Sequence, residues 1–197
     1  MDSLIVEDPH ALFDAWLEEA GKTEPTDPNA MTVATVSPDG RPSARILLLK
    51  GHDAGGFVFY TNLESRKGQE IAATPVAALL FHWKSLARQI RIEGPLAPVT
   101  EAEADAYFAS RHRISRIGAW ASDQSRPLEN RAVLEARVAE MEAKFEGGEP
   151  PRPPHWSGFR LTPEHMEFWQ DMPYRLHDRV IYTPKPEGGW ATQRLFP

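Results

Sequence analysis

The spacing of apolar residues predicts a helix near the start of the chain. Residues 8–21 carry large apolar side chains at intervals of three and four, which is helical spacing. Asp8 followed by Pro9 is typical of a helix N-terminus, and Gly21 is typical of a C-terminus. We therefore expect an amphipathic helix over 8–21, followed by a polar, proline-containing linker.

Residues 30–99 change to a strand pattern. The stretches MTVATV, ARILLLK, GFVFYTN, VAALLFHW and RQIRIEGPLAPV are β-branched, alternating or continuously apolar. Turn residues such as SPDG separate them, so consecutive strands are expected to pair antiparallel. One short helix, SRKGQEIAA, interrupts the series, with Ser65 as its N-cap. This region predicts five strands and one inserted helix.

Residues 100–146 return to helical spacing. Thr100 with Glu103 forms a capping box for a helix to about Arg111. Pro127 is expected to open a longer helix with an apolar stripe. Residues 156–197 are again strand-like: GFRLTP, HMEFWQ, RLHDRVIYTP and WATQRLF. The order predicts one domain over 1–197, mainly β with α: a small antiparallel barrel with flanking helices. No glycine-rich dinucleotide fingerprint is present.

Composition and charge narrow the functional classes. The chain has 197 residues, 41% hydrophobic and 25% charged, with no cysteine, which is ordinary globular composition. No secretory signal or membrane-length apolar run is visible, so a soluble, cytoplasmic protein without a membrane or nucleic-acid partner is expected. The net charge is −6, yet residues 41–116 carry 11 Lys/Arg and 7 Asp/Glu. A basic middle suggests a local anion site; chance is an equally good explanation.

The segment RLHDR places unusual charge in a predicted strand. Alternation would put Arg175, His177 and Arg179 on one face, with Leu176 and Asp178 on the other. Three donors on one half-buried face need an anionic or oxygen-rich partner. A salt-bridged edge strand is the alternative.

A second candidate combines a strand with the helix after it. Arg45, Leu47 and Leu49 of RILLLK share one strand face. Arg66 and Lys67 lie in the first turn of the short helix, where cations oppose the helix dipole. A bound phosphate would reverse that penalty, because free backbone N–H groups and both side chains could reach it. A solvated Arg-Lys pair is the alternative.

A third candidate is YFASRHRIS. Tyr107 and Arg111 are four residues apart on one helical face, and Ser115 follows four residues later. Phenol, guanidinium and hydroxyl groups together can bind a second phosphate, although a simple surface contact is the alternative. No HExxH, close histidine pair or GxSxG occurs, so a metal site is not expected.

Taken in order, these segments resemble the pyridoxamine 5′-phosphate oxidase family, whose fold is an FMN-binding split barrel. The similar stretches are RILLLK, GFVFYTNLESRKGQEI, LARQIRIEG, YFASRHRISRIGAWASDQS, EFWQ, RLHDR and the terminal RLFP. The resemblance implies an antiparallel split barrel of six to eight strands with flanking helices. It also implies a homodimer with FMN at the interface.

The resemblance also implies residue roles. Arg175 and His177 are expected to be catalytic, with Arg175 contributing most. The substrate-binding positions implied are Lys50, Tyr107, Arg111, Ser115, Arg175, Leu176 and His177. The FMN-binding positions implied are Arg45, Ile46, Leu47, Leu48, Leu49, Lys50, Tyr60, Thr61, Arg66, Lys67, Gln89, Gln124, Ser125, Trp169 and Arg179. The implied reaction oxidises the C4′ alcohol or amine of a phosphorylated pyridine to the aldehyde, with O₂ as acceptor and hydrogen peroxide released.

Two departures from the family pattern affect these expectations. Family members often carry a basic N-terminal arm over the substrate, whereas this chain begins MDSLIVEDPH, so that lid is expected to be absent. The family usually has glycine after the glutamine of EFWQ, where this chain has Asp171-Met172-Pro173-Tyr174. The alternatives are a related split-barrel flavoenzyme for a phenazine-type ring and a non-catalytic FMN- or pyridoxal-phosphate-binding protein.

Overall fold

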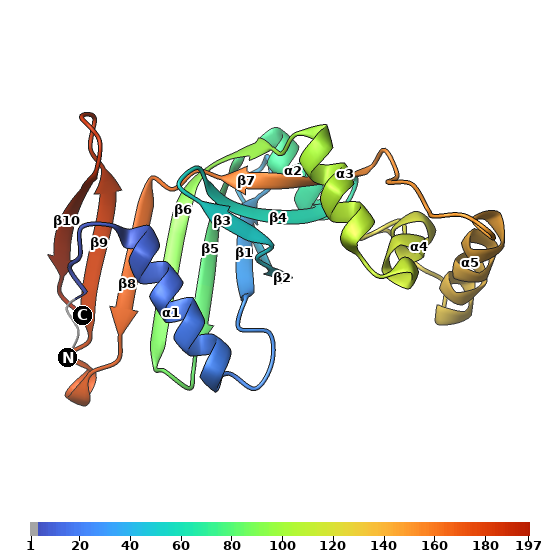
Figure 1. Cartoon of the computed structure of the whole chain (residues 1–197). Helices are drawn as coiled ribbons and strands as arrows, with labels where there is room; N and C mark the ends of the chain where they lie inside the picture. The colour runs from blue at the N-terminus through green and yellow to red at the C-terminus, as the bar shows by residue number, and fades with distance from the viewer. Residues whose placement is uncertain (1–3) are drawn as a thin grey trace.

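Ten antiparallel strands form one curled sheet in residues 4–197, the part of the chain that the computed structural model describes (Figure 1). Residues 1–3, which begin the segment MDSLIVEDPH, lie outside it. The strands are β1 (Ala30–Val36), β2 (Pro42–Leu48), β3 (Gly51–Asp53), β4 (Gly56–Asn62), β5 (Val76–Trp83), β6 (Arg88–Pro98), β7 (Trp156–Leu161), β8 (His165–Gln170), β9 (Asp178–Pro184) and β10 (Trp190–Leu195).

The long strand β6 connects the two parts of this sheet. Its first residues pair with β5 on one side and β8 on the other, within the order β10-β9-β8-β6-β5-β1-β2. Its last three residues pair instead with β7, which pairs with β4. The change of partner bends the sheet back on itself without full closure. This is the split barrel expected from the sequence, with more strands than the six to eight expected.

Gly94 allows the close approach that this bend requires. A Cβ atom at Gly94 would lie 1.9 Å from the backbone oxygen of Thr162, at the turn between β7 and β8. Only a residue without a side chain fits there. The inner face of the sheet is filled by aromatic rings, with Phe13 packed edge-on to Phe57 at 5.0 Å and to Phe81 at 5.2 Å.

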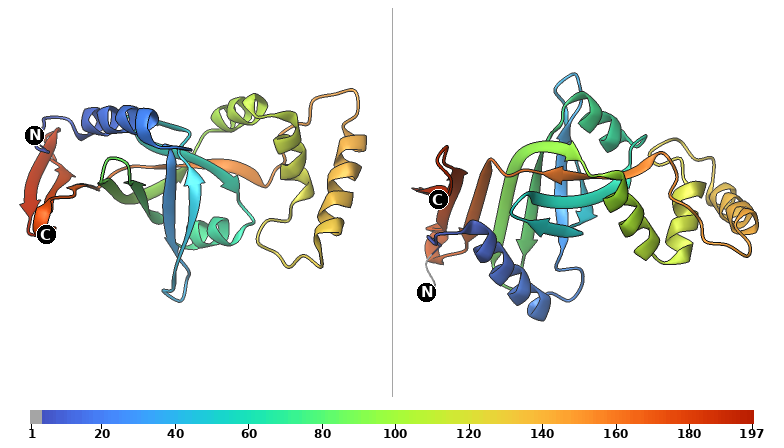
Figure 2. Two further views of the ribbon diagram at one scale, coloured as in Figure 1. Left: turned by 90° about the horizontal axis from the view of Figure 1, so that it is seen from below. Right: turned by 45° about the horizontal axis from the view of Figure 1, so that its top comes forward.

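Five helices lie outside the described sheet: α1 (Pro9–Thr23), α2 (Arg66–Ala73), α3 (Glu101–Ser110), α4 (Arg113–Ala121) and α5 (Arg131–Lys144). Figure 1 shows α1 lying across the sheet, and Figure 2 shows α4 and α5 extending away from it. The expected caps are present, since Ser65 accepts from Gly68 N and Thr100 forms the capping box with Glu103. None of the described helices has the length and hydrophobicity that a membrane span needs.

Two helices have boundaries that differ from the expected ones, and one helix was not expected. Helix α1 continues past Gly21 to Thr23, because Pro25 forces the preceding Glu24 into an extended conformation and so ends the helix there. Helix α5 begins at Arg131 rather than at Pro127, because the Asn130 side chain caps Val133 N. Helix α4 was not expected at all, and the apolar stripe of α5 packs half-buried against it.

The expectation that RLHDR forms a strand is wrong. Strand β9 begins only at Asp178, opposite Gln170 of β8, and residues 171–177 form the connecting loop. Pro173 starts a single 3₁₀ turn, and Tyr174 and Arg175 adopt left-handed backbone angles with φ of 60° and 63°. A proline without an N–H and two left-handed residues cannot continue a β-ladder. Arg175 and His177 therefore belong to a loop, and Arg179 belongs to the strand.

Two glycine substitutions test this account of the fold. Gly94→Ala should lower the free energy of unfolding by about 2–3 kcal/mol, because the new methyl group would collide with backbone. Gly21→Ala is the matched control: nothing lies within 4 Å of its added Cβ, so it should stabilise helix α1 by about 0.5–1 kcal/mol. Urea denaturation measures both. Equal stabilities for the two variants would contradict the close approach at Gly94.

Candidate functional site

Lys67 lies at the first turn of α2 and forms no ion pair with a carboxylate within residues 4–197. Its ammonium group is 2.7 Å from Gln124 Oε1, 3.0 Å from Thr61 Oγ1 and 3.3 Å from Ser65 Oγ. The side chain is buried. Burial and the nearby charge of Arg45 lower the pKa of Lys67 to about 8. A buried ammonium with only neutral acceptors is well suited to receive an anion.

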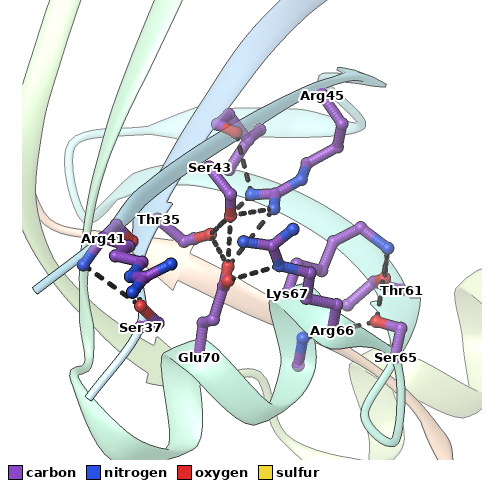
Figure 3. Close-up of polar contacts among 12 residues, drawn as sticks. Thr35, Ser37, Arg41, Ser43, Arg45, Thr61, Ser65, Arg66, Lys67 and Glu70 are labelled. Carbon is purple, nitrogen blue, oxygen red and sulfur yellow. Dashed lines mark hydrogen bonds and ion pairs between the residues drawn. The ribbon is translucent and has the colours of Figure 1, made fainter. Parts of the chain in front are cut away.

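Glu70, one turn further along α2, collects four hydrogen-bond donors (Figure 3). Its carboxylate accepts from Thr35 at 2.5 Å, from Ser43 at 2.6 Å, from Arg45 at 3.3 Å and from Arg66 at 2.8 Å. Burial by itself would raise the pKa of Glu70. The hydrogen bonds from both hydroxyls and both arginines outweigh it and lower the pKa to about 2. Glu70 is therefore ionised at neutral pH.

We call Arg45, Thr61, Arg66, Lys67 and Gln124, together with Glu70, the α2 cluster. Three cations and one carboxylate leave it with two excess positive charges, which match the dianion of a phosphate monoester. The N-terminus of α2 adds backbone N–H groups and the positive end of its dipole. The chemistry of these residues therefore fits a phosphate group, and the binding of one by Arg66 and Lys67 stays a prediction.

A second group of predicted residues surrounds a stack of aromatic rings. Tyr60 lies nearly parallel to Tyr107 at 4.1 Å and to Trp156 at 5.4 Å. The Arg111 guanidinium is 4.9 Å from the Trp156 ring centroid, and Lys50 Nζ is 5.9 Å from that of Tyr107. We call these five residues the aromatic group.

The Arg111 side chain carries an unused donor. Its Nη1 is buried and has no hydrogen-bond partner within residues 4–197. Burial also lowers the pKa of Arg111. Leaving a buried donor unsatisfied costs about 1–3 kcal/mol, which a bound anion would recover. The expected continuation of helix α3 ends at Arg111, so the predicted neighbour Ser115 lies on the separate helix α4. There its backbone N–H donates to the carbonyl oxygen of His112.

A third group lies on the strands β6, β8 and β9 and on the loop that joins β8 to β9. Gln89, Trp169 and Arg179 face one another in register across these strands. The His177 ring centroid is 4.7 Å from that of Trp169, and His177 Nδ1 is 2.8 Å from the Asp171 carboxylate. Arg175 and Leu176 are exposed on the 171–177 loop. We call the predicted residues Gln89, Trp169, Arg175, Leu176, His177 and Arg179 the C-terminal group.

The remaining predicted positions are on β2 and after α4. Ile46 is exposed, Leu47 and Leu48 are half-buried, Leu49 is buried, and Ser125 has a left-handed backbone with φ of 72°. Strand β2 ends the sheet path, so one side of its backbone has no partner strand among the described residues. Its free N–H and C=O groups can therefore bind a ligand or a second chain.

The three groups do not all meet within one chain. Thr61 of the α2 cluster follows Tyr60 of the aromatic group on β4, so those two groups are neighbours. Within the C-terminal group, Gln89 on β6 is three inter-strand spacings from β2, Trp169 on β8 is four and Arg179 on β9 is five, at about 4.8 Å each. Figure 1 shows α2 and the loop between β8 and β9 at opposite ends of the sheet.

Sequence reasoning missed four members of the site: Thr35, Ser43, Glu70 and Trp156. Thr35 continues the buried face of β1, and a polar residue on a buried strand face is a signal that could have been used. Ser43 is its partner in the β1–β2 register. Glu70 is four residues after Arg66, which is the helical ion-pair spacing. Trp156 carries no such signal.

The curled antiparallel sheet, which bends back without closing, defines a split-barrel protein. Comparison with protein-family models matches residues 17–145 to "Pyridoxamine 5′-phosphate oxidase" and residues 156–197 to "Pyridoxine 5′-phosphate oxidase C-terminal dimerisation region". The chain belongs to the pyridoxamine 5′-phosphate oxidase family, which implies a flavin cofactor. The match to a dimerisation region indicates a homodimer.

Named relatives cover almost the whole chain. The pyridoxine/pyridoxamine 5′-phosphate oxidase of Caulobacter vibrioides is 67% identical over 97% of this chain and 86% of its own length. That of Rhodospirillum rubrum is 64% identical, with both chains fully covered. Among solved structures, PhzG from Burkholderia lata, in complex with tetrahydrophenazine-1-carboxylic acid, has a TM-score of 0.90 and 35% identity, covering 100% of this chain and 99% of its own.

Acid titration tests the environment of Glu70. A lowered pKa stabilises the fold above the ordinary value of 4.5, and that stabilisation is lost as pH falls toward 2. Wild type should therefore exceed Glu70→Gln in free energy of unfolding by about 3 kcal/mol at pH 7. This difference in the free energy of unfolding should become smaller as the pH falls from 4.5 to 3. Urea denaturation at a series of pH values measures it. Parallel curves for the two proteins over that range would contradict an ionised, strongly bonded Glu70.

Proposed function

We propose that the protein is an FMN-dependent oxidase that converts pyridoxine 5′-phosphate or pyridoxamine 5′-phosphate into pyridoxal 5′-phosphate. O₂ is the acceptor and hydrogen peroxide the second product. The observation that carries this proposal is the presence of two separate anion-binding groups: the α2 cluster and the buried, unpaired Arg111 donor. A phosphorylated cofactor and a phosphorylated substrate require two such sites.

The α2 cluster is the proposed site of the FMN phosphate. Arg66 and Lys67 would bind it together with the first N–H groups of α2, and Arg45 would contribute charge from β2. The free edge of β2, over Arg45 to Leu48, would then hold the flavin ring by its backbone. Gln124 already bonds Lys67, which ties the loop after α4 to the same site.

The aromatic group is the proposed site of the substrate phosphate. Lys50, Tyr107 and Arg111 would supply two cations and a phenol, with Ser115 approaching from α4. The Arg111 guanidinium is already positioned by its contact with Trp156, so its free N–H is pre-oriented. Both phosphate sites would draw on strand β4, through Tyr60 and Thr61, whose side chains leave opposite faces of that strand.

The C-terminal group is proposed to complete the site of the partner subunit. Arg175 and His177 would hold the pyridine ring against the flavin, while Gln89, Trp169 and Arg179 would contact the flavin itself. Support comes from the separation of this group from β2 within one chain and from the match of residues 156–197 to a dimerisation region. Each FMN would then lie at the homodimer interface, between residues of both chains.

The reaction removes a hydride from C4′ of the substrate and a proton from the oxygen or nitrogen attached to it. The flavin, when bound, supplies the acceptor for these electrons and passes them to O₂. The chain's own residues orient the substrate and stabilise charge: Arg175 donates hydrogen bonds near C4′, and His177 is held by Asp171 and the Trp169 ring. An alcohol gives the aldehyde directly, whereas an amine gives an imine that water hydrolyses to the aldehyde and ammonia.

A second candidate is oxidation of a phenazine-type ring, favoured by the similarity to PhzG. An aerobic assay of the FMN-loaded protein separates the two. Pyridoxine 5′-phosphate should yield aldehyde and hydrogen peroxide in equal amounts, and pyridoxamine 5′-phosphate should also react. Turnover of tetrahydrophenazine-1-carboxylic acid with neither phosphate ester oxidised would favour the second candidate instead.

Arg175→Ala tests the proposed catalytic role. We expect kcat to fall about 100-fold while FMN content stays unchanged, because the side chain would orient substrate and not cofactor. The control is Arg131→Ala, which removes an exposed arginine of α5 that forms an ion pair with Glu135. Steady-state kinetics and flavin absorbance measure the two quantities. Unchanged turnover in Arg175→Ala would contradict the role.

The pH dependence of FMN binding tests the role of Lys67. Its pKa of about 8 in the free protein means that it loses its proton as pH rises, and phosphate binding requires the protonated form. FMN affinity should therefore fall about tenfold between pH 7 and pH 9. Riboflavin, which lacks the phosphate, should show no such change, and Lys67→Arg should flatten the FMN profile. Identical pH profiles for FMN and riboflavin would contradict direct binding by Lys67.

A further inference from the structure

We propose that Glu70 is a positioning residue for the cofactor phosphate: it holds Arg45 and Arg66 in the arrangement that receives the anion without contacting it. This inference rests on the proposed function of the α2 cluster. It assigns a role to a carboxylate inside a site proposed to bind a phosphate, which carries the same sign of charge. Such a residue would otherwise be expected to weaken phosphate binding by like-charge repulsion.

Two hydroxyl bridges fix the Arg45 guanidinium. Arg45 Nη1 donates to Thr35 Oγ1 at 2.5 Å, and Arg45 Nη2 donates to Ser43 Oγ at 2.6 Å. Each hydroxyl in turn donates to Glu70 Oε2. The hydroxyls therefore carry the acceptor character of Glu70 to both ends of the Arg45 fork, and a direct contact of 3.3 Å adds to them (Figure 3).

Arg66 is held at one nitrogen only. Its Nε donates to Glu70 Oε1 at 2.8 Å, and no other hydrogen bond of its guanidinium is found within residues 4–197. The two Nη groups thus stay available, while the side chain as a whole is 62% exposed. An exposed arginine without this anchor would sample many rotamers and lose part of its contribution on binding. Glu70 removes that freedom before the ligand arrives.

The charge of Glu70 also makes the cluster possible. Arg45 and Lys67 repel each other closely enough for Arg45 to lower the pKa of Lys67. A carboxylate beside Arg45 and Arg66 offsets part of that repulsion in the free protein, when no phosphate is present. The remaining excess of two positive charges equals the charge of a phosphate monoester dianion.

A purely structural role predicts a different result from a positioning role. If Glu70 only tied α2 to β1 and β2, its loss would displace Lys67 and the α2 N-terminus, and FMN binding would weaken as much without Arg66 as with it. If it positions the arginines, its loss weakens FMN, spares riboflavin, which presents the same ring without the phosphate, and has a smaller effect once Arg66 is removed. The ratio of the two dissociation constants, measured with and without Arg66, therefore separates the roles and needs no turnover measurement.

The experiment titrates flavin-free protein with FMN and with riboflavin, following the quenching of flavin fluorescence. Glu70→Ala should raise the FMN Kd at least tenfold and leave the riboflavin Kd within twofold. Glu70→Asp keeps the charge but moves the carboxylate away from Arg66, so it should raise the FMN Kd severalfold. This variant replaces Glu70→Ala in the test if the alanine variant does not fold. Glu64→Ala, which removes an exposed carboxylate paired with Arg126 just before α2, is the matched control.

The effect of Glu70→Ala on the FMN/riboflavin ratio should be smaller in an Arg66→Ala background, because part of it passes through Arg66. A ratio unchanged in both Glu70 variants, or an effect as large without Arg66 as with it, overturns the inference. In either case wild type would still prefer FMN strongly over riboflavin. A wild-type protein without that preference would instead contradict the proposed cofactor site.

Discussion

The buried carboxylate of Glu70 constrains how β1, β2 and α2 pack, because a charge withdrawn from water must find its donors within the chain. Thr35 and Ser43 lie opposite each other in the β1–β2 register and so present two hydroxyls to one point. Helix α2 must bring Glu70 to that point, which fixes the direction in which its N-terminus opens. The position of Lys67 follows from the same helix, three residues earlier. One desolvated group thus sets the orientation of α2 relative to the sheet edge.

The strands were predictable because their signal is local. Nine of the ten overlap segments whose apolar alternation or apolar runs indicated a strand, and only the three-residue β3 had no such pattern. The caps Ser65 and Thr100 were predictable for the same reason, since a cap depends on residues three positions apart. RLHDR failed because its charges suggested alternation, whereas Pro173 and the left-handed Tyr174 and Arg175 decide the backbone there. The backbone conformation of residues 173–175, and not the alternation of side chains, therefore determines where strand β9 begins.

The residues of the candidate site also divide into those that the sequence could indicate and those that it could not. Resemblance to a known family indicated Arg66, Lys67, Tyr107 and Arg111, and the structure places these residues in two neighbouring groups with free donors. Glu70 and its two hydroxyl partners could not be inferred from the family motifs, because they act through other side chains and are defined by the β1–β2 register and the docking of α2. The distance of the C-terminal group from β2 was equally invisible in the sequence, because it depends on strand order and not on strand identity.

The separation of the C-terminal group from the α2 cluster has a genetic consequence under the proposed dimer. Each complete site would draw one half from each subunit, so a chain defective in Lys67 and a chain defective in Arg175 would carry their lesions in different halves. Mixed in one cell, they could form a heterodimer with one site that bears both lesions and one that bears neither. Two inactive alleles would then complement each other, and the ceiling of recovered activity would be set by the statistics of subunit exchange.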